Sequence, residues 1–442
     1  MNTTLEHSTT NILESSNTNI NGGAADMNLV ATQAAEKKLL LQTYDRHPIL
    51  LTRGEGVHLF DDAGNRYLDL LSGIGVSALG YNHPAITKAI SEQATTLLHT
   101  SNLFYHSGTA TLALKLTELA GMDRVFFCNS GTEAWEAALK LARAHAGLLR
   151  EEGKTIGTRI IAMEHSFHGR TIGAVSTTHK LKYREPFNPV MPDVIFVPFN
   201  DVAALRAAFD ENVCAIALEC LQGEGGIHPV SQEFLMAARE LCNSNGALLL
   251  CDEIQSGMGR TGKWCMYQHY GIQPDVTTLA KPLAGGLPMG AMLCSEEASR
   301  AITPGMHGTT FGGGPLACAV AIAVIDEIQK SNLLAHVTEV SNYFIEQLRG
   351  LAARHESIVE VRGAGFMIGM EMKSEEIARQ ITDSMLYEQH ILINRTSETV
   401  LRFLPPYLIT KADVDETIAA LSSLISKVET AQSVLAGEKI HG

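Results

Sequence analysis

Short apolar runs alternate with helix-length segments between about residues 125 and 295. Such an alternation is typical of a sheet whose strands are joined by crossover helices. We therefore predict an α/β fold with a mostly parallel central sheet. Several runs end in a polar residue or a glycine-rich turn, which is where open α/β sheets bind ligands. The expected strands cover residues 125–128, 159–163, 194–199, 214–219, 247–251 and 276–280.

The two ends of the chain have patterns of their own. A chain of 442 residues is too long for one small core. We expect a capping box of Thr410 and Asp413 to start the final helix, followed by an apolar stripe at residues 414, 418, 421, 425 and 428. The domains expected are a disordered tail (1–28), a large domain (76–324) and a smaller α+β domain built from both chain ends (29–75 and 325–442).

Composition argues against several functional classes. The formal net charge of −14 disfavours binding to nucleic acid or to anionic membranes. The longest apolar run, 316–325, has about half of the ~20 residues needed to cross a bilayer. Residues 1–27 contain no Lys or Arg and no apolar stretch, so we expect neither a signal nor a transit peptide. The eight cysteines lack C-x-x-C spacing, which suits reduced, buried thiols in a cytoplasmic protein.

Two charged residues follow apolar runs. Lys281 is the only charged residue between positions 276 and 295, and desolvation there would lower the pKa of its amine, as Schiff-base formation requires. Asp252 could keep a pyridine nitrogen protonated. Their separation of 29 residues allows one helical crossover, so adjacent strands could bring both groups to one site. A surface lysine and a turn-capping aspartate remain the simpler explanations of each residue alone.

The segment CNSGTEAWEAALKLARAH (128–145) ends a strand and opens a long helix. The backbone N–H groups of Gly131 and Thr132 would lie at the positive end of the helix dipole, which suits a phosphate. An ordinary helix N-cap explains the segment nearly as well. A second turn, with Gly308, Thr309 and Thr310, offers further hydroxyl donors.

Other segments carry groups suited to a planar cofactor and an acidic substrate. In SFHGRT (166–171), Phe167 could stack on a ring and Arg170 could bind a carboxylate, although a surface turn is the alternative. Arg402 is a second candidate for binding a carboxylate. Glu224 could neutralise Arg402 when no second carboxylate is bound.

One glycine-rich segment resembles a dinucleotide fingerprint. Gly257, Gly259 and Gly262 have G-x-G-x-x-G spacing, with Asp275 eighteen residues after the first glycine. The residues that follow have no helical stripe, so we expect a loop. An NAD-dependent dehydrogenase is therefore a minor alternative. The 17 histidines include no metal-binding spacing, and we expect no metal site.

Taken in order, the motifs resemble those of class III aminotransferases, which are pyridoxal-phosphate enzymes of fold type I, the aspartate-aminotransferase-like fold. The resemblance extends from about residue 35 to the end of the chain. It is carried by HTSNLFY (99–105), NSGTEA (129–134), FHGRT (167–171), QGEGG (222–226), DEIQSGMGRTG (252–262), LAKPLAGGLPMGA (279–291) and HGTTFGG (307–313).

The resemblance implies a role for each candidate residue. Lys281 would bind the cofactor covalently and serve as general base and acid, and Asp252 would pair with the pyridinium nitrogen. Thr310 would reach the phosphate of the neighbouring subunit's cofactor, which implies a homodimer with shared active sites. The remaining implied roles are contact with the ring hydroxyl (Gln255), ring stacking (Phe167), phosphate binding (Gly131 and Thr132), donor binding (Arg170 and Thr309) and a glutamate-specific switch (Glu224 and Arg402).

Within this family the motifs are most similar to enzymes acting on N2-acetylornithine. The implied reaction transfers its δ-amino group to 2-oxoglutarate, giving N-acetylglutamate 5-semialdehyde and glutamate, a step of arginine biosynthesis. Ile74 stands where ornithine aminotransferases carry a tyrosine, which favours an acylated donor. Ornithine, succinylornithine, 4-aminobutyrate or a diamine are alternative donors, and a non-catalytic relative is a further alternative. The chain departs from the usual family pattern at Cys220, Trp135, Pro282 and Gly314.

Overall fold

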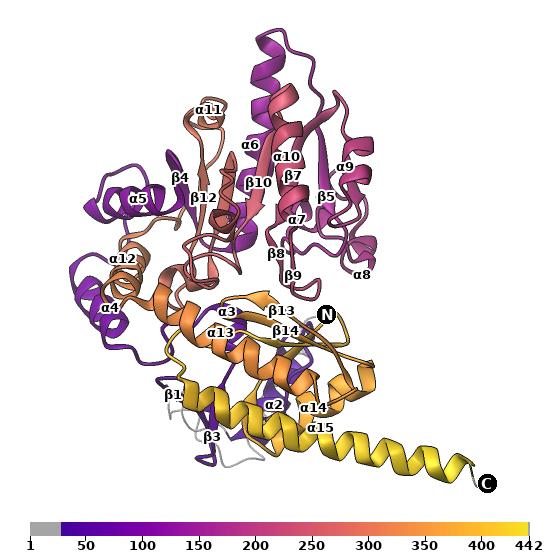
Figure 1. The fold of residues 1–442 in the computed structure, drawn as a ribbon. Coiled ribbons are helices and arrows are strands. Elements are labelled where there is room, and N and C mark those ends of the chain that lie inside the picture. The colour runs from indigo at the N-terminus through magenta and orange to yellow at the C-terminus, as the bar shows by residue number, and fades with distance from the viewer. Residues whose placement is uncertain (1–27, 441–442) are drawn as a thin grey trace, which may run out of the picture.

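The computed structural model describes residues 28–440, in which a large lobe lies on a small one (Figure 1). The large lobe contains a seven-stranded sheet in which β12 runs antiparallel to both neighbours and the other adjacent pairs run parallel. The expected α/β fold with a mostly parallel sheet is confirmed. In spatial order the strands are β4 (Arg124–Cys128), β12 (Gly290–Cys294), β11 (Val276–Leu279), β10 (Leu248–Asp252), β7 (Val213–Glu219), β5 (Arg159–Met163) and β6 (Val194–Val197).

The observed strands follow the predicted ones closely. β5 has the predicted bounds, β6 ends two residues early, and β4, β7, β10 and β11 differ by one residue at one or both ends. The apolar pattern does not predict β12. The tail expected at residues 1–28 lies outside the described residues except for Asn28, whose side chain caps α2 (Leu29–Leu39).

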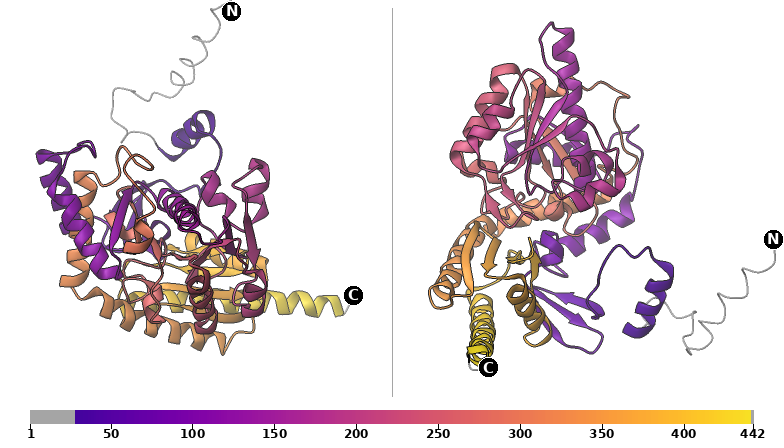
Figure 2. Two further views of the ribbon diagram at one scale, coloured as in Figure 1. Left: turned by 90° about the horizontal axis from the view of Figure 1, so that it is seen from above. Right: turned by 90° about the vertical axis from the view of Figure 1, so that its right-hand side faces the viewer.

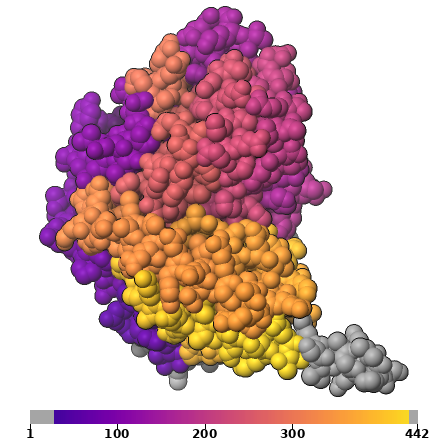
Figure 3. Space-filling view, viewed as in Figure 1, coloured from indigo at the N-terminus to yellow at the C-terminus, as the bar shows by residue number. Residues whose placement is uncertain are grey.

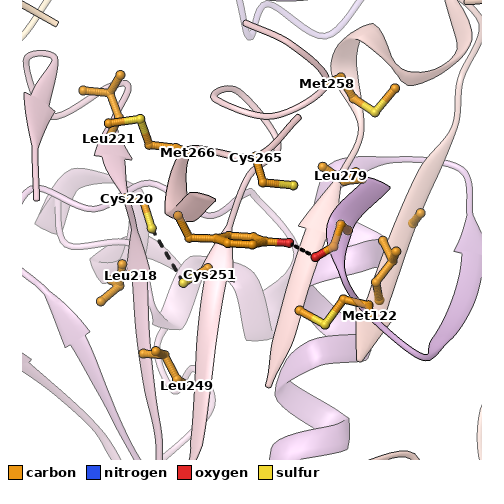
Figure 4. Close-up of a cluster of buried hydrophobic side chains, with 14 of the residues drawn as sticks. Met122, Leu218, Cys220, Leu221, Leu249, Cys251, Met258, Cys265, Met266 and Leu279 are labelled. Atoms are coloured by element: carbon orange, nitrogen blue, oxygen red, sulfur yellow. Dashed lines mark hydrogen bonds between the residues drawn. The ribbon is translucent and has the colours of Figure 1, made fainter. Parts of the chain in front are cut away.

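Helices cover both faces of the central sheet. Along β10, Leu249 and Cys251 pack in a core with α5 (Ser107–Ala120) and α10 (Gln232–Asn245), part of which is drawn in Figure 4. Leu248 and Leu250 face the other way and pack against α6 (Gly131–Glu151). Because both faces are buried, a strand such as β7 is apolar almost throughout and ends in one acidic residue.

Shorter elements connect and border this sheet. Several of them carry the loops at its carboxyl edge, where the site lies. They are α4 (Pro84–Thr96), α7 (Ile172–Ser176), α8 (Leu181–Arg184), η2 (Glu185–Phe187), α9 (Val202–Ala208), β8 (Leu221–Gln222), β9 (His228–Pro229), η3 (Met266–His269), η4 (Lys281–Ala284) and α11 (Glu296–Ser299).

The small lobe combines both ends of the chain. β15 (Ile391–Leu392) pairs in parallel with β3 (Arg66–Asp69) and so joins the N-terminal sheet. Figure 3 shows indigo and yellow residues side by side at the base of the molecule. The other elements are β1 (Leu51–Glu55), β2 (His58–Asp61), α3 (Ser72–Gly75), α13 (Leu333–Ala352), β13 (Ile358–Ala364), β14 (Met367–Met372), α14 (Glu375–Tyr387), β16 (Asn394–Thr396), β17 (Val400–Phe403) and α15 (Lys411–Ile440).

Helix α12 (Pro315–Lys330) packs in the cores of both lobes. The domain boundary expected between residues 324 and 325 falls inside this helix. One helix therefore ties the small lobe to the edge of the large sheet. Cys318, Ala321 and Ile325 pack in the large core, and Val320, Val324 and Ile328 pack in the small one.

Two helices at the chain ends differ in how they pack. The predicted capping box of α15 is confirmed, because the Asp413 carboxylate accepts from the Thr410 N–H (2.7 Å) and the Thr410 hydroxyl accepts from the Asp413 N–H (3.3 Å). By contrast, α2 has no buried residue and stands apart from the rest of the described chain (Figure 2). Among the described helices, none is long and apolar enough to cross a membrane.

Candidate active site

A cavity of about 470 Å³ opens at the carboxyl edge of the central sheet. Its walls come from the segments that follow β4, β5, β7, β10 and β11. These strands run in the same direction, so their polar end residues converge on one space. The predicted site residues that line the cavity are Gly131, Thr132, Phe167, Arg170, Glu224, Asp252, Gln255 and Lys281.

Lys281 follows β11 and begins the short helix η4. Its φ of 34° lies in the left-handed region, an uncommon conformation for a non-glycine residue that recurs at active sites. Burial lowers the pKa of its amine to about 8, although the nearby Glu224 carboxylate acts in the opposite direction. A lysine with this pKa supplies a neutral, nucleophilic amine close to neutral pH.

Asp252 ends β10, next to the strand that delivers Lys281. Its carboxylate accepts hydrogen bonds from the Ile254 N–H (3.0 Å), the Thr278 hydroxyl (3.4 Å) and His168 Nδ1 (2.7 Å). Three donors from three segments hold this buried carboxylate in place at the cavity wall. His168 was not assigned a role from the sequence, although it lies within the motif FHGRT.

The start of α6 forms the end of the cavity near β4. Ser130 caps the helix by accepting from the Glu133 N–H (3.3 Å). The N–H groups of Gly131 and Thr132 have no acceptor among the described residues, as is usual in a first helical turn. The Thr132 hydroxyl contacts the Thr171 hydroxyl (2.8 Å). This helix end therefore presents free donors to an anion.

Phe167 is held by a buried carboxylate that the sequence analysis missed. Its N–H donates to Glu219 Oε1 (2.9 Å), and the Gly223 N–H donates to Glu219 Oε2 (2.8 Å). Glu219 is the register partner of Asp252 on the adjacent strand. Its position at the end of an apolar run is the signal that could have identified it. Burial raises the pKa of Glu219 to about 7.

Arg402 reaches the cavity wall from β17 of the small lobe. Its buried guanidinium forms an ion pair with Glu224 (Nη1 to Oε1, 2.5 Å) and also contacts Gln255 Oε1 (3.4 Å) and Asn394 Oδ1 (3.1 Å). Burial alone would raise the pKa of Glu224, but the charge and hydrogen bond of Arg402, together with the charge of Lys281 and a hydrogen bond from Gln255, outweigh burial and lower it. Arg402 therefore touches the cavity through Glu224 and does not itself line it.

Arg170 is exposed at the mouth of the cavity. Its guanidinium lies over the ring of Tyr183, 3.8 Å from the ring centroid. No carboxylate among residues 28–431 pairs with it within 4.0 Å. Its charge is thus available to an anionic ligand.

Thr309 and Thr310 do not line the cavity of their own chain. Thr309 contacts a residue that lines the cavity, because its hydroxyl accepts a hydrogen bond from Nδ2 of Asn129 (3.1 Å). Thr310 is exposed and follows directly in the same turn. Both threonines therefore lie between the cavity and the outer surface.

The glycine-rich segment at residues 257–262 is a loop, as the sequence analysis predicts. A Cβ at Gly259 would lie 2.8 Å from Leu334 Cδ2, so the glycine permits close packing on α13. Arg260, fully buried, donates to the carbonyls of Phe366 and Pro405 in the small lobe. Gly259 and Gly262 therefore permit close packing between the lobes, and Gly257 permits close packing on Leu279 within the large lobe.

The cavity residues fit pyridoxal phosphate. Free N–H donors at the start of α6 suit its phosphate, and Asp252 suits its ring nitrogen. Phe167 offers an aromatic face, and Lys281 supplies a neutral amine for its aldehyde. A Cβ at Gly131 would lie 2.9 Å from Ile254, so this glycine keeps the phosphate end open.

Comparisons with known proteins identify the family. A family model described as "Aminotransferase class-III" matches residues 41–425. Acetylornithine aminotransferase of Caldanaerobacter subterraneus subsp. tengcongensis is 44% identical over 393 residues, covering 89% of this chain and 98% of the relative. Its counterpart in Methanocaldococcus jannaschii is 46% identical over 396 residues, covering 89% and 98%.

Solved structures agree with the family match. Ornithine aminotransferase of Toxoplasma gondii superposes with a TM-score of 0.86 at 32% identity, covering 92% of this chain and 96% of that one. Acetylornithine aminotransferase of Elizabethkingia anophelis gives 0.80 at 32% identity, covering 91% and 100%. The chain therefore belongs to the class III aminotransferases.

Proposed function

We propose that this enzyme transfers the δ-amino group of N2-acetylornithine to 2-oxoglutarate, giving N-acetylglutamate 5-semialdehyde and glutamate, a step of arginine biosynthesis. Curated relatives named acetylornithine aminotransferase, 43–47% identical to this chain, support the choice of donor. The structural observation that carries the proposal is the Glu224–Arg402 ion pair of 2.5 Å beside Lys281. Such a pair lets one site accept both a δ-amine and a dicarboxylate.

Class III aminotransferases depend on pyridoxal phosphate, which when bound supplies a ring that withdraws electrons from the substrate carbon. In this proposal the Lys281 amine holds the cofactor covalently and the Asp252 carboxylate faces the ring nitrogen. The remaining contacts are to the ring hydroxyl (Gln255), the ring face (Phe167) and the phosphate (Gly131 and Thr132).

Lys281 is the residue that would move the proton. Its Nζ would take the proton from the substrate carbon that bears the amino group and, as a general acid, donate that proton to the cofactor. The pKa of about 8 suits both steps, because neutral and protonated amine are then both populated near neutral pH. No other amine among the cavity-lining residues is available for this task.

Glu224 and Arg402 act as a switch between the two half-reactions. With the amino donor bound, the Glu224 carboxylate neutralises Arg402. When 2-oxoglutarate binds, Glu224 moves aside and the Arg402 guanidinium binds one of its carboxylates bidentately. Arg170, whose charge is unpaired within the described chain, binds the donor carboxylate, and Thr309 supports the donor from the adjacent turn.

Ornithine is the second candidate donor, favoured by the superposition on the ornithine aminotransferase structure. Ile74 argues against it, because an isoleucine offers no hydroxyl to a free α-amino group. Ile74 has a left-handed φ of 62° and is 40% exposed, so its side chain is free of packing that a tyrosine would disturb.

A panel of amino donors tests the choice of substrate. We expect the highest kcat/KM with N2-acetylornithine, and we expect Ile74→Tyr to shift the ratio of kcat/KM values toward ornithine. Ornithine, succinylornithine, 4-aminobutyrate and a diamine complete the panel. If acetylornithine were turned over no better than 4-aminobutyrate, the proposed donor would be wrong.

Spectroscopy and labelling test the cofactor and its attachment. We expect a yellow protein whose absorbance changes when glutamate is added. Borohydride reduction followed by peptide mapping should label Lys281, and Lys281→Ala should remain unlabelled. A label on another lysine would refute the proposed attachment.

We further propose a cytoplasmic homodimer with shared active sites. The eight cysteines are all free and buried, which fits a reducing compartment. The dimer is supported by an apolar surface beside Thr310, formed by Leu103, Phe104, Tyr105 and Phe311. Asn102 ties its two segments together by donating to the carbonyls of Thr309 (3.0 Å) and Gly312 (3.2 Å).

A further inference from the structure

Trp135 lies flat against the imidazole that holds Asp252. The rings of Trp135 and His168 are parallel within 8°, with centroids 4.0 Å apart. Both side chains are buried, and the indole Nε1–H donates to the Thr177 hydroxyl (2.9 Å). This hydrogen bond holds the indole at its edge, because the N–H lies in the plane of the ring. Trp135 is also a position at which the chain departs from the usual family pattern.

The contacts of His168 define its tautomer. Nδ1 donates to Asp252 Oδ2 (2.7 Å), so the ring proton lies on Nδ1. Nε2 is buried and has no hydrogen-bond partner among the described residues. One hydrogen bond constrains the tilt of the ring only loosely, because the imidazole can still turn through small angles about its Cβ–Cγ bond. The flat face of Trp135 supplies the missing constraint.

We propose that Trp135 is a positioning residue for the cofactor: it holds the His168 ring in the plane from which Nδ1 supports Asp252, and so keeps that carboxylate aimed at the cofactor's pyridine nitrogen. The proposal rests on pyridoxal phosphate binding at Asp252. Trp135 touches neither the cavity nor the cofactor and acts through His168 alone.

Positioning of His168 by Trp135 can be distinguished by experiment from simple packing of Trp135 in the hydrophobic core. Trp135 is one turn along α6 from Gly131, so a purely structural defect would also disturb the phosphate end of the cavity. A defect in aiming Asp252 would weaken binding of the ring and leave binding of phosphate unchanged. Inorganic phosphate and pyridoxal phosphate therefore separate the two roles.

The test measures equilibrium affinity of the apoenzyme for pyridoxal phosphate and, by competition, for inorganic phosphate. Trp135→Met keeps most of the side-chain volume but lacks a flat ring. It should lower the affinity for pyridoxal phosphate about tenfold and leave the affinity for inorganic phosphate unchanged. Trp135→Phe keeps a ring and should stay within about threefold of wild type. Thr177→Val removes the indole's hydrogen-bond partner without changing Trp135. It should lower the affinity for pyridoxal phosphate about two- to threefold.

A double-mutant cycle tests the path through His168. In His168→Asn the amide still donates to Asp252, but no ring remains to stack. In the His168→Asn background, Trp135→Met should therefore cause no further loss of affinity for pyridoxal phosphate. Additive losses, equal losses for phosphate and pyridoxal phosphate, or unchanged affinity in Trp135→Met and Thr177→Val would each overturn the proposal. If the wild-type apoenzyme failed to bind pyridoxal phosphate, the proposed function itself would fail.

Discussion

Lys281 is the residue whose chemistry depends most on its surroundings. Burial lowers the pKa of its amine to about 8, and Glu224 opposes this effect. Because only the neutral amine reacts with an acylating reagent, labelling of Lys281 in the apoenzyme should rise from pH 6 and level off above about pH 9. Surface lysines, with pKa near ~10.4, should continue to rise through pH 10.

Competitive acetylation followed by mass spectrometry measures this profile. The Glu224→Gln variant is the matched control, because removing the carboxylate that raises the pKa of Lys281 should move its midpoint to lower pH. A Lys281 profile that follows the surface lysines would contradict the assignment of a desolvated amine.

Glu219 connects the segments that follow two neighbouring strands, β5 and β7. Its carboxylate accepts from the backbone N–H groups of Phe167 and Gly223, so both oxygens need to be acceptors. In Glu219→Gln an amide N–H group faces one of these donors. We expect a loss of about 1–3 kcal/mol in unfolding free energy together with weaker binding of pyridoxal phosphate.

Glu253→Gln is the control for this prediction. Glu253 is equally buried and accepts from the Tyr267 N–H (3.0 Å) and the Ser256 hydroxyl (2.6 Å), but it does not line the cavity. Denaturant unfolding should show a similar loss of stability, whereas equilibrium dialysis should show unchanged cofactor affinity. Equal cofactor affinity in both variants would mean that Glu219 is only a core residue.

Predicted site residues line the cavity where a motif or a strand end marked their positions. Lys281 and Asp252 follow apolar strands, and parallel strands bring such ends to one edge. Glu219 has the same signature but was passed over, because a single acidic strand end is also a common turn cap. The stack of Trp135 on His168 could not be predicted from the sequence. It joins helix α6 to the loop after β5, and it depends on the rotamers of both side chains.

At the scale of elements, the junction of β12 and β4 sets the position of α6. Gly290 opposes Cys128 in the antiparallel pair, and a Cβ there would overlap the Ser130 carbonyl and lie 2.8 Å from Cys128 Sγ. Gly290→Ala should therefore push the Ser130 turn away and displace the first turn of α6. We expect a loss of about 1–3 kcal/mol in unfolding free energy and weaker binding of inorganic phosphate.

Gly350→Ala is the matched control, because a Cβ at this position in α13 meets nothing within 4 Å. It should leave phosphate binding unchanged and raise stability by up to ~1 kcal/mol. Thermal unfolding and phosphate competition measure both quantities. Unchanged phosphate affinity in Gly290→Ala would show that phosphate binding at the first turn of α6 does not depend on this contact.

Elements with local signals were predictable and those defined by distant partners were not. The start of α15 follows from Thr410 and Asp413, which lie within one turn of each other. β12 was missed because the apolar run 290–294 carries no information on direction or partner. β15 has two residues and is a strand only because it pairs with β3, more than 300 positions away.

At the scale of the whole molecule, Thr310 and a neighbouring apolar surface are both exposed on the single chain. Thr310 does not line its own cavity, and it adjoins exposed side chains such as Leu103 (86%) and Phe104 (69%). Apolar patches of this kind are typical of protein–protein contacts. In the proposed two-fold dimer each chain would contribute the same patch, and Thr310 of each chain would lie beside the other chain's site.

Mixed dimers provide the decisive measurement of this arrangement. Lys281→Ala removes the proposed catalytic amine of its own chain, and Thr310→Glu would place a negative charge against the phosphate that Thr310 is proposed to contact. Both homodimers should be inactive. If Thr310 acts across the interface, a purified heterodimer contains one site with both residues intact and should recover about half of the wild-type activity. If Thr310 acts within its own chain, the heterodimer has no intact site, and no activity should return.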